Sequence, residues 1–327
     1  MIQNNDVYAY LTDATDRARG KMMKINITGH TVGQGIVALA AIGLLTVIGG
    51  GQAGAVDESA NVERITLSPS STTVEIDAGT VQRGTMTVRN DGDVAYGFSV
   101  YARPYGVVNE LYEPDFTNQQ ANTSVYKWVQ FDQTKYQVAA GESVEVKYTI
   151  RVPENATPGG HYGVLFAETD EQALEGTGVA RKKRVGNLMY VTVKGEYKTS
   201  GAFKEFILPF WQTRAPVVSS VRVENTGNAD FRARVSTIAK DMFGRTKYTY
   251  TSDPIVLPST TRLVEMKWEA APNFGIFKVD QSIEFLQQKK QNSGYVLVAP
   301  RWAPILVIVI IAAGASYAVL HRRNSRR

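Results

Sequence analysis

The feature that most constrains this chain is an apolar–polar alternation with a period of two, which runs through most of its central part. Segments such as STTVEID, SVEVKYTIRV and NLMYVTVKG show it clearly. Gly, Asn, Asp and Pro separate such segments at intervals of about 8–12 residues, as in β-sandwiches. No long segment of this part repeats apolar residues at the spacing of an amphipathic helix. The pattern predicts an all-β fold built from β-sandwiches.

An internal repeat indicates that there are two sandwiches. VRNDGDVAYGFSVY, residues 88–101, aligns with VENTGNADFRARVS, residues 223–236, which begins 135 positions further on. Each copy reads as a strand, an Asn-x-Gly turn and a second strand, because Asn and Gly tolerate positive φ. We predict domain one over 62–198 and domain two over 201–290. The segment QQKKQNSGYVLVAPRW is then predicted to be a short stalk.

The N-terminal part has the composition of an export signal. Residues 1–34 form a basic, cytosolic n-region, and residues 35–50 are an uncharged apolar run that predicts a signal or anchor helix. Ala53 and Ala55 follow at the small-x-small spacing that a signal peptidase accepts. Cleavage after Ala55 is the prediction. Because the n-region is long, an uncleaved signal anchor is the alternative.

The 18 apolar residues over 303–320 predict a C-terminal transmembrane helix. At a rise of 1.5 Å per residue they extend roughly 27 Å, close to the thickness of the hydrocarbon core. The basic tail 321–327 holds four arginines, and basic residues beside a span favour the cytoplasm. Residues 56–300 are therefore predicted to be extracellular. The protein would be membrane-embedded with one span, or with two if the signal is retained.

The charge of the chain is concentrated at its ends. The sequence pI is about 9.2, yet residues 57–300 hold 27 Lys+Arg and 28 Asp+Glu. The basic residues that raise the pI flank the two apolar runs, where they orient membrane segments. The central part has no net positive charge with which to attract phosphates, so we expect no nucleic-acid partner.

Candidates for catalytic and metal chemistry are few. The chain has no cysteine, and His161 is the only histidine between the two apolar runs, so zinc has too few ligands. No G-x-S-x-G motif and no calcium-loop motif accompanies it. We interpret the surrounding VPENATPGGHYGVLFAE as strand, Pro-Gly-Gly turn and strand, with Tyr162, Val164 and Phe166 on one face. The chain is predicted to be no enzyme and to need no cofactor or metal.

Three segments together resemble a known family. ITLSPSSTTVEIDAGTVQRGTMTVRNDG, SVEVKYTIRVPENATPGGHYGVLFAE and RVGNLMYVTVKG are similar to the first domain of the WxL-interacting surface proteins of Gram-positive bacteria. That family's turn reads V-P-x-x-A-x-P-G-x-Y-Y-G, and this chain matches it at Val152, Pro153, Ala156, Pro158, Gly159, Tyr162 and Gly163. The resemblance implies two immunoglobulin-like domains, of which the first binds peptidoglycan and the second binds other surface proteins or host ligands. A similarity to pilus-chaperone sandwiches is more distant.

These observations predict a non-catalytic, membrane-anchored bacterial cell-surface protein. Its partner would be cell-wall glycan (peptidoglycan) or an envelope protein, with lateral assembly among surface proteins as a further possibility. The long loop over 103–124 supplies the predicted ligand-binding residues Arg103, Tyr105 and Tyr112. The alternative is a structural or chaperone-like subunit of a surface appendage or secretion complex. An exposed edge strand that can pair with another chain would favour that alternative.

Overall fold

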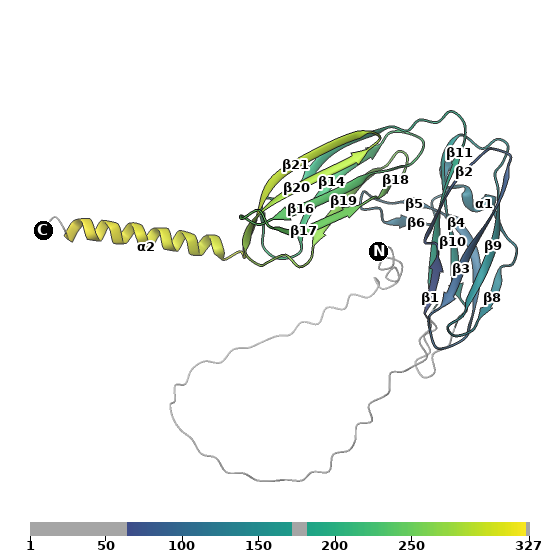
Figure 1. Ribbon diagram of the computed structural model, residues 1–327, viewed down its shortest axis with the longest axis horizontal. Helices are drawn as coiled ribbons and strands as arrows, with labels where there is room; N and C mark the ends of the chain where they lie inside the picture. Colours follow the sequence, from purple (N-terminus) through teal and green to yellow (C-terminus); the bar gives the residue numbers. More distant parts are fainter. Residues whose placement is uncertain (1–63, 172–181, 325–327) are drawn as a thin grey trace, which may run out of the picture.

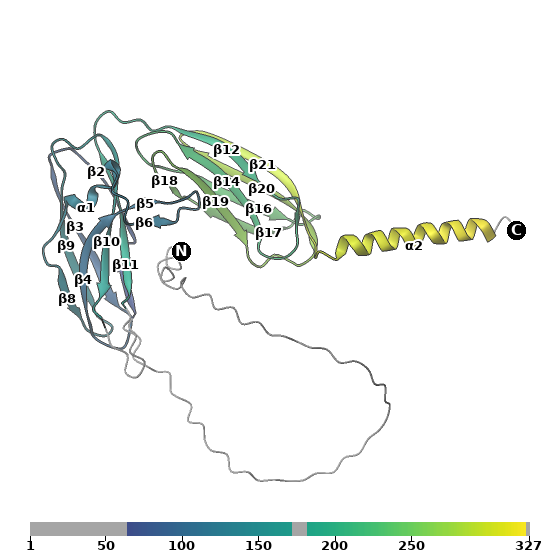
Figure 2. The same cartoon turned by 180° about the vertical axis from the view of Figure 1, so that it is seen from behind.

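The computed structural model describes residues 64–171 and 182–324, which form two β-sandwich domains followed by a long helix (Figure 1). The predicted n-region, the apolar run over 35–50 and the cleavage residues Ala53 and Ala55 lie outside the described residues. Viewed from behind, the two sandwiches lie at an angle to each other and the helix leaves the far end of the second (Figure 2). The prediction of an all-β fold with two sandwiches is confirmed.

Domain one packs two sheets around a single apolar core. The first sheet has the order β1 (Ile65–Ser68), β3 (Val81–Asn90), β9 (Ser143–Arg151), β7 (Val129–Phe131). The second has the order β2 (Ser71–Ile76), β11 (Arg184–Val193), β10 (Gly159–Thr169), β4 (Tyr96–Pro104), β8 (Lys135–Val138). Every ladder is antiparallel except the one between β2 and β11. Alternate side chains of both sheets form the core, as the period of two requires.

The connection between β4 and β7 contains short elements rather than open coil. These are β5 (Gly106–Val107), β6 (Pro114–Asp115), the 3₁₀ turn η1 (Ala121–Thr123) and α1 (Val125–Trp128). The sequence predicts a strand over YKWVQFD, but its first half is the helical turn α1 and only the second half is β7. One turn of helix places Val125 and Trp128 on the same side, and both are buried.

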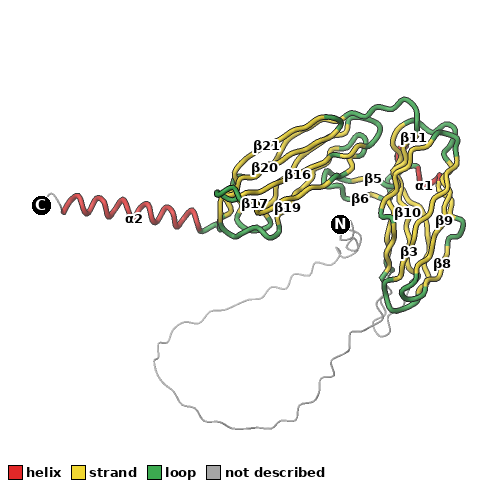
Figure 3. Tube along the Cα trace, viewed as in Figure 1, coloured by secondary structure: helices red, strands yellow, loops and turns green. Residues whose placement is uncertain are grey.

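Domain two is also a pair of sheets. One has the order β12 (Gly201–Ile207), β14 (Val217–Asn225), β19 (Thr261–Trp268). The other has the order β13 (Trp211–Gln212), β21 (Gln288–Val298), β20 (Gly275–Phe285), β16 (Arg234–Lys240), β17 (Thr246–Ser252). A short ladder joins β15 (Phe231–Arg232) to β18 (Ile255–Val256). Figure 3 shows that both domains consist of strands and loops, apart from the helical turn α1 in domain one.

The predicted stalk is wrong, and the end of domain two at 290 is too early. Most of that segment is β21, which pairs with β20 from Gln288 to Val298 without a register shift. Leu286 and Gln287 form the tight turn between them, both with positive φ. The first half of β21 is exposed on both faces, so its polar residues show no alternation in the sequence.

The two copies of the sequence repeat fold in the same way. Asn90 and Asn225 are fully buried at equivalent positions. Each side-chain amide donates to two carbonyls, those of Val94 and Ala139 in domain one and those of Ala229 and Val256 in domain two. Each side-chain oxygen accepts from the glycine amide two residues further on. The repeated asparagines therefore hold the turns and the neighbouring loops together, which is a structural role.

The C-terminal segment is helical. Helix α2 (Ala303–Asn324) includes the whole apolar run that predicts a transmembrane segment. Within residues 64–171 and 182–324, no helix has both the length and the mean hydropathy of a membrane span. The segment is helical, and the predicted transmembrane span is not confirmed.

Candidate functional site

The loop predicted to bind a ligand folds back on its own domain and contacts domain two. Tyr105 and Tyr112 are 6% and 9% exposed, and they pack in one cluster with residues of β10 and β11 and with Leu257 of domain two. Arg103 is exposed, with its guanidinium 5.4 Å from the ring centroid of Tyr101. The structure thus brings the two tyrosines together and leaves the arginine apart. A ligand-binding role for the three residues stays a prediction.

Tyr112 is the central residue of this contact. Its hydroxyl lies 2.6 Å from the Thr260 hydroxyl and accepts a hydrogen bond of 2.8 Å from the backbone amide of Leu257. The guanidinium of Arg262 lies over its ring at 4.1 Å from the centroid. The backbone of Tyr112 has a φ of 63°, a conformation that residues other than glycine rarely adopt. The contacts made by the side chain offset that strain.

A second group of contacts extends from the tip of the same loop. The carbonyl of Glu110 accepts a hydrogen bond of 2.7 Å from the amide of Leu263, which lies on the edge strand β19. The carboxylate of Glu110 pairs with Arg222 at 2.7 Å, and Arg222 also pairs with Glu205. The loop therefore caps part of the edge of β19 with backbone and side-chain bonds.

The Pro-Gly-Gly turn makes the third contact between the domains. The amide of Gly160 donates to the carbonyl of Asn228 at 2.8 Å, and the Asn228 side chain bonds the Lys198 amide and the Pro158 carbonyl. A Cβ on Gly159 would lie 2.5 Å from the Asn228 carbonyl oxygen. The glycine allows the two backbones to approach this closely. Asn228 itself belongs to the Asn-x-Gly turn of the second repeat.

The same turn positions a buried pair of ionisable groups. The hydroxyl of Tyr162, on β10, donates a 2.8 Å hydrogen bond to the Asp230 carboxylate of domain two. Burial, with the nearby negative charge of Asp230, raises the pKa of Tyr162 above its usual range. Burial also raises the pKa of the Asp230 carboxyl, although the bond from Tyr162 opposes the shift. Burial lowers the pKa of Arg262 on the other side of the interface.

Asp230 gives the domain interface a predicted pH dependence. Because its pKa is raised in the folded protein, its contribution to stability is complete below the unfolded pKa of 3.8 and is lost as pH rises through the folded value. Asp230→Asn keeps an acceptor for Tyr162 and removes the buried charge. We expect this variant to be at least as stable as the parent at neutral pH, with a flatter dependence of melting temperature on pH above 3.8.

Thermal unfolding at a series of pH values measures this effect. Asp93→Asn, which removes an exposed carboxylate at the equivalent turn of domain one, controls for the change in net charge. If Asp230→Asn and Asp93→Asn change the pH profile equally, Asp230 has no special part in it.

His161 lies inside domain one. It is 4% exposed, its Nε2 lies 2.8 Å from the Thr157 carbonyl, and its ring packs 4.7 Å from that of Trp128. Its Nδ1 has no hydrogen-bond partner among the described residues. The interpretation of His161 as a strand residue is confirmed, since it lies on β10 with Tyr162, Val164 and Phe166 facing the opposite side.

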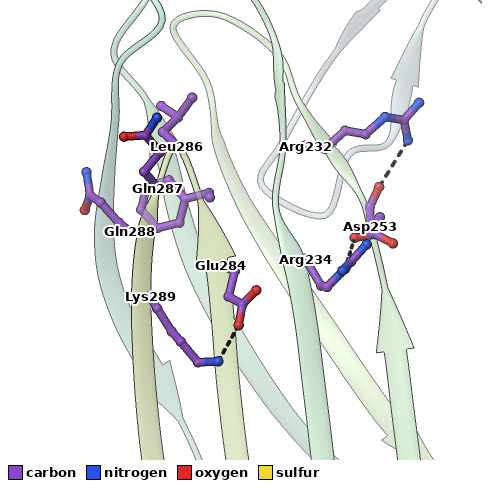
Figure 4. A pocket seen from close by; sticks show the side chains of 9 residues that line it. Arg232, Arg234, Asp253, Glu284, Leu286, Gln287, Gln288 and Lys289 are labelled. Carbon is purple, nitrogen blue, oxygen red and sulfur yellow. Dashed lines mark hydrogen bonds and ion pairs between the residues drawn. The ribbon is translucent and has the colours of Figure 1, made fainter.

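The described part of the chain offers little else for chemistry. No group of three or more potential ligands there could hold a metal ion. An open hollow of 680 Å³ lies beside the β20–β21 turn (Figure 4). Its charged groups already pair with one another, because Arg234 contacts Asp253 at 2.9 Å and Lys289 contacts Glu284 at 2.5 Å. The hollow is an exposed groove between paired side chains.

Sequence reasoning missed most of this interface. It selected Tyr105 and Tyr112 because aromatic residues are dense in a long loop, but it gave them an external ligand. Among their partners on domain two, Asn228 and Asp230 lie in the second copy of the repeat, which predicts a turn and no contact between domains, and Arg262 belongs to no motif. The family pattern predicts the Pro-Gly-Gly turn, whereas its close approach to Asn228 follows only from the packing of the two domains.

Comparisons with known proteins match the fold alone. No protein-family model matches the sequence, and no curated protein matches it. Among solved structures, a chain of the chaperone–tip adhesin complex of CFA/I fimbriae biogenesis is 11% identical, with 72% of this chain and 99% of that chain covered and a TM-score of 0.37. A chain of the Salmonella enterica SafA pilin–SafB chaperone complex is 10% identical, with 72% of this chain and 97% of that chain covered and a TM-score of 0.37.

The E. coli chaperone DraB is 10% identical, covers 71% of this chain and 98% of its own, and has a TM-score of 0.36. All three neighbours come from structures of chaperones or of complexes that contain a chaperone. At TM-scores of 0.36–0.37 the likeness carries no argument about what the chain binds. Membership of the WxL-interacting family is not shown by these comparisons and stays a prediction.

Proposed function

We propose that this chain is a non-catalytic bacterial cell-surface protein that assembles with another protein by accepting a β-strand on β21. The observation that carries the proposal is the open edge of this strand. Among the described strands, β21 has a second neighbour only at Leu297 and Val298, where it pairs with β13. From Gln288 to Val296 it is paired on one side alone, with β20.

The other sheet edges of the described residues suit strand addition less well. β1, β7 and β8 are four residues or shorter. β12 and β17 each contain a register shift in their ladder, which interrupts a regular edge. β19 already receives the Glu110 carbonyl from domain one. β2 is regular but has only six residues, so β21 offers the longest regular edge.

The composition of the edge fits a protein partner. The segment from Gln291 to Val296 carries no charge, whereas Lys289 and Lys290 follow the turn. Lysines on an edge oppose indiscriminate pairing, so an added strand would pair over the uncharged part. Hydrogen bonds from the backbone amides and carbonyls would supply the affinity. The exposed side chains of Gln291, Ser293 and Tyr295 would contact those of the added strand and give specificity.

The contacts between the domains support an assembly role, because they hold domain one in a defined orientation relative to β21. The interface joins Tyr112, Glu110 and Gly160 of domain one to domain two by hydrogen bonds. A fixed orientation lowers the entropy lost when a partner contacts both domains. Attachment to the membrane by the apolar segment over 303–320, with the sandwiches outside the cell, is part of the proposal and rests on the sequence.

Site-specific crosslinking tests the edge directly. Because the chain has no cysteine, Gln291→Cys and Tyr295→Cys can each carry a thiol-reactive photocrosslinker in the otherwise unchanged protein. Irradiation of intact cells, followed by mass spectrometry, identifies the captured molecule. We expect both positions to capture the same protein. Thr87→Cys, at an exposed site on β3 that pairs with Ser68 of β1 on one side and Glu145 of β9 on the other, is the matched control and should not capture it.

The outcomes separate the two functions predicted from the sequence. Equal capture from position 87 would show that β21 is not the binding edge. Recovery of peptidoglycan without a protein would support the glycan-binding alternative instead. As a second variant, Gln291→Lys with Tyr295→Lys adds two charges to the edge, and co-purification of the partner should then fall roughly tenfold, the equivalent of about 1.4 kcal/mol.

A further inference from the structure

The end of domain two next to α2 exposes five large apolar side chains on four segments. They lie in the β12–β13 connection, the β16–β17 turn, the β19–β20 connection and the residues before α2: Phe210, Met242, Phe243, Phe274 and Trp302. Each is between 61% and 82% exposed. We call these five residues the base surface. Apolar side chains gathered at one end of a domain mark an interaction site rather than ordinary surface.

Strand register places these segments at the same end. Val298, the last residue of β21, pairs with Gly275, the neighbour of Phe274, and with Gln212 of β13. The β16–β17 turn follows Lys240, which pairs with Lys278 near the start of β20. Figure 1 shows β16 and β17 reaching the end of the domain from which α2 leaves.

The chain enters α2 directly from this surface. The Trp211 indole donates a 2.9 Å hydrogen bond to the Ala299 carbonyl, and the Ala303 amide bonds the Pro300 carbonyl. These bonds keep the start of the helix against the domain. On α2 itself, apolar side chains such as Ile308 and Ile311 are more than 60% exposed. Exposed apolar side chains are thus present both on the base surface and on the helix that leaves it.

Positive charge accompanies the apolar residues. Arg214 and Arg301 line a hollow of 340 Å³ with Thr213 and Pro300, and within the described residues neither guanidinium forms an ion pair. Of the acids on the segments that reach this end, Asp241 is paired with Arg245 and Lys247, and Asp280 is paired with Lys240 and Lys278. Arg214 and Arg301 therefore supply positive charge without an acidic partner among the described residues. Such guanidiniums suit lipid phosphates at a membrane interface.

We propose that the base surface rests in the headgroup layer of an anionic phospholipid bilayer, with Arg214 and Arg301 binding lipid phosphates. This inference rests on the membrane attachment in the proposed function. Insertion of Phe, Met and Trp side chains from several loops would hold the sandwiches at a fixed tilt, which α2 alone cannot do because a single helix can rotate and tilt. The open edge of β21 would then face along the membrane at a constant height.

Nitroxide labelling of single-cysteine variants measures this depth. The full chain is reconstituted in phosphatidylcholine–phosphatidylglycerol vesicles with a label at Met242→Cys or Asn273→Cys, beside Phe243 and Phe274. Tyr317→Cys reports on α2. Thr249→Cys, exposed on β17 of the same domain, is the matched control. We expect the ratio of oxygen to nickel accessibility at 242 and 273 to exceed that at 249 severalfold.

The labels distinguish this inference from membrane attachment itself. If the accessibility ratio at position 317 is that of lipid and the ratios at 242 and 273 are those of water, this inference is overturned and membrane attachment stands. A water-like label at Tyr317 overturns both. The double variant Arg214→Gln, Arg301→Gln should lower the ratio of oxygen to nickel accessibility at positions 242 and 273. Vesicles of pure phosphatidylcholine should lower the same ratio in the parent protein. Equal immersion of the labels in both lipid mixtures would contradict the phosphate contacts. The crosslinking test at β21 does not depend on these labels, so the proposed strand addition is tested independently of this inference.

Discussion

Tyr112→Ala is expected to destabilise the protein by about 3–5 kcal/mol, the range for removing a large buried aromatic side chain. The variant leaves the amide of Leu257 without its acceptor and removes the ring beneath the Arg262 guanidinium. It also keeps a side chain at a positive φ, so no strain is released. The change should therefore reduce the coupling between the two domains as well as the total stability.

Denaturant unfolding followed by tryptophan fluorescence measures both effects. Trp128 reports on domain one and Trp268 on domain two, and both are buried. We expect one transition in the parent and two in Tyr112→Ala. Tyr112→Phe, which removes only the hydroxyl, should cost about 1–3 kcal/mol because a buried amide loses its partner.

The matched control is Tyr295→Ala, since that ring is 60% exposed and its removal should change stability by no more than about 0.5 kcal/mol. Equal losses at positions 112 and 295 would show that the loop does not hold the domains together.

Gly159→Ala is the second change with a large expected effect. Its φ of 121° strains any residue with a side chain, at a cost of about 1–3 kcal/mol. The added Cβ would also lie 2.5 Å from the Asn228 carbonyl oxygen, so the backbones of the two domains must separate. Overpacking of this kind adds about 1–3 kcal/mol. Together, we expect a loss of roughly 3–5 kcal/mol.

Gly141 provides a control that isolates the contact between the domains. It has a φ of 75°, and a Cβ there would meet nothing within 4 Å. Gly141→Ala should therefore cost only the backbone strain. Thermal unfolding compares the two variants, and limited proteolysis of the linker between Val193 and Gly201 shows whether the domains have separated. If the two variants have similar melting temperatures and similar linker cleavage, the clash with Asn228 does not contribute to the loss of stability.

The strands were predictable because their cause is local. β9, for example, alternates exposed and buried residues from Ser143 to Arg151, which is what a strand covered on one face must show. β10 differs, because nearly all its residues from Gly159 to Thr169 are buried. One face packs in the core of domain one and the other against Tyr105 and Tyr112, so the sequence shows apolar residues without revealing the second covering layer.

The wrong prediction of a stalk at β21 has a non-local cause. β21 begins with Gln288, Lys289 and Lys290, whose side chains all face water, and a strand exposed on both faces leaves no alternation. Its assignment depends on pairing with β20 across a tight turn. The candidate site behaves in the same way, since the loop around Tyr112 meets Thr260 only because the two domains pack together.

The sequence by itself determined the class of fold, the number of domains and the equivalent turns at Asn90 and Asn225. These properties follow from a period of two and from the backbone preferences of Asn and Gly, which act over a few residues. Only the tertiary structure decided that Tyr105 and Tyr112 face domain two and that β21 keeps an open edge. Both depend on which distant segments pair, and pairing is fixed by the packing of whole sheets.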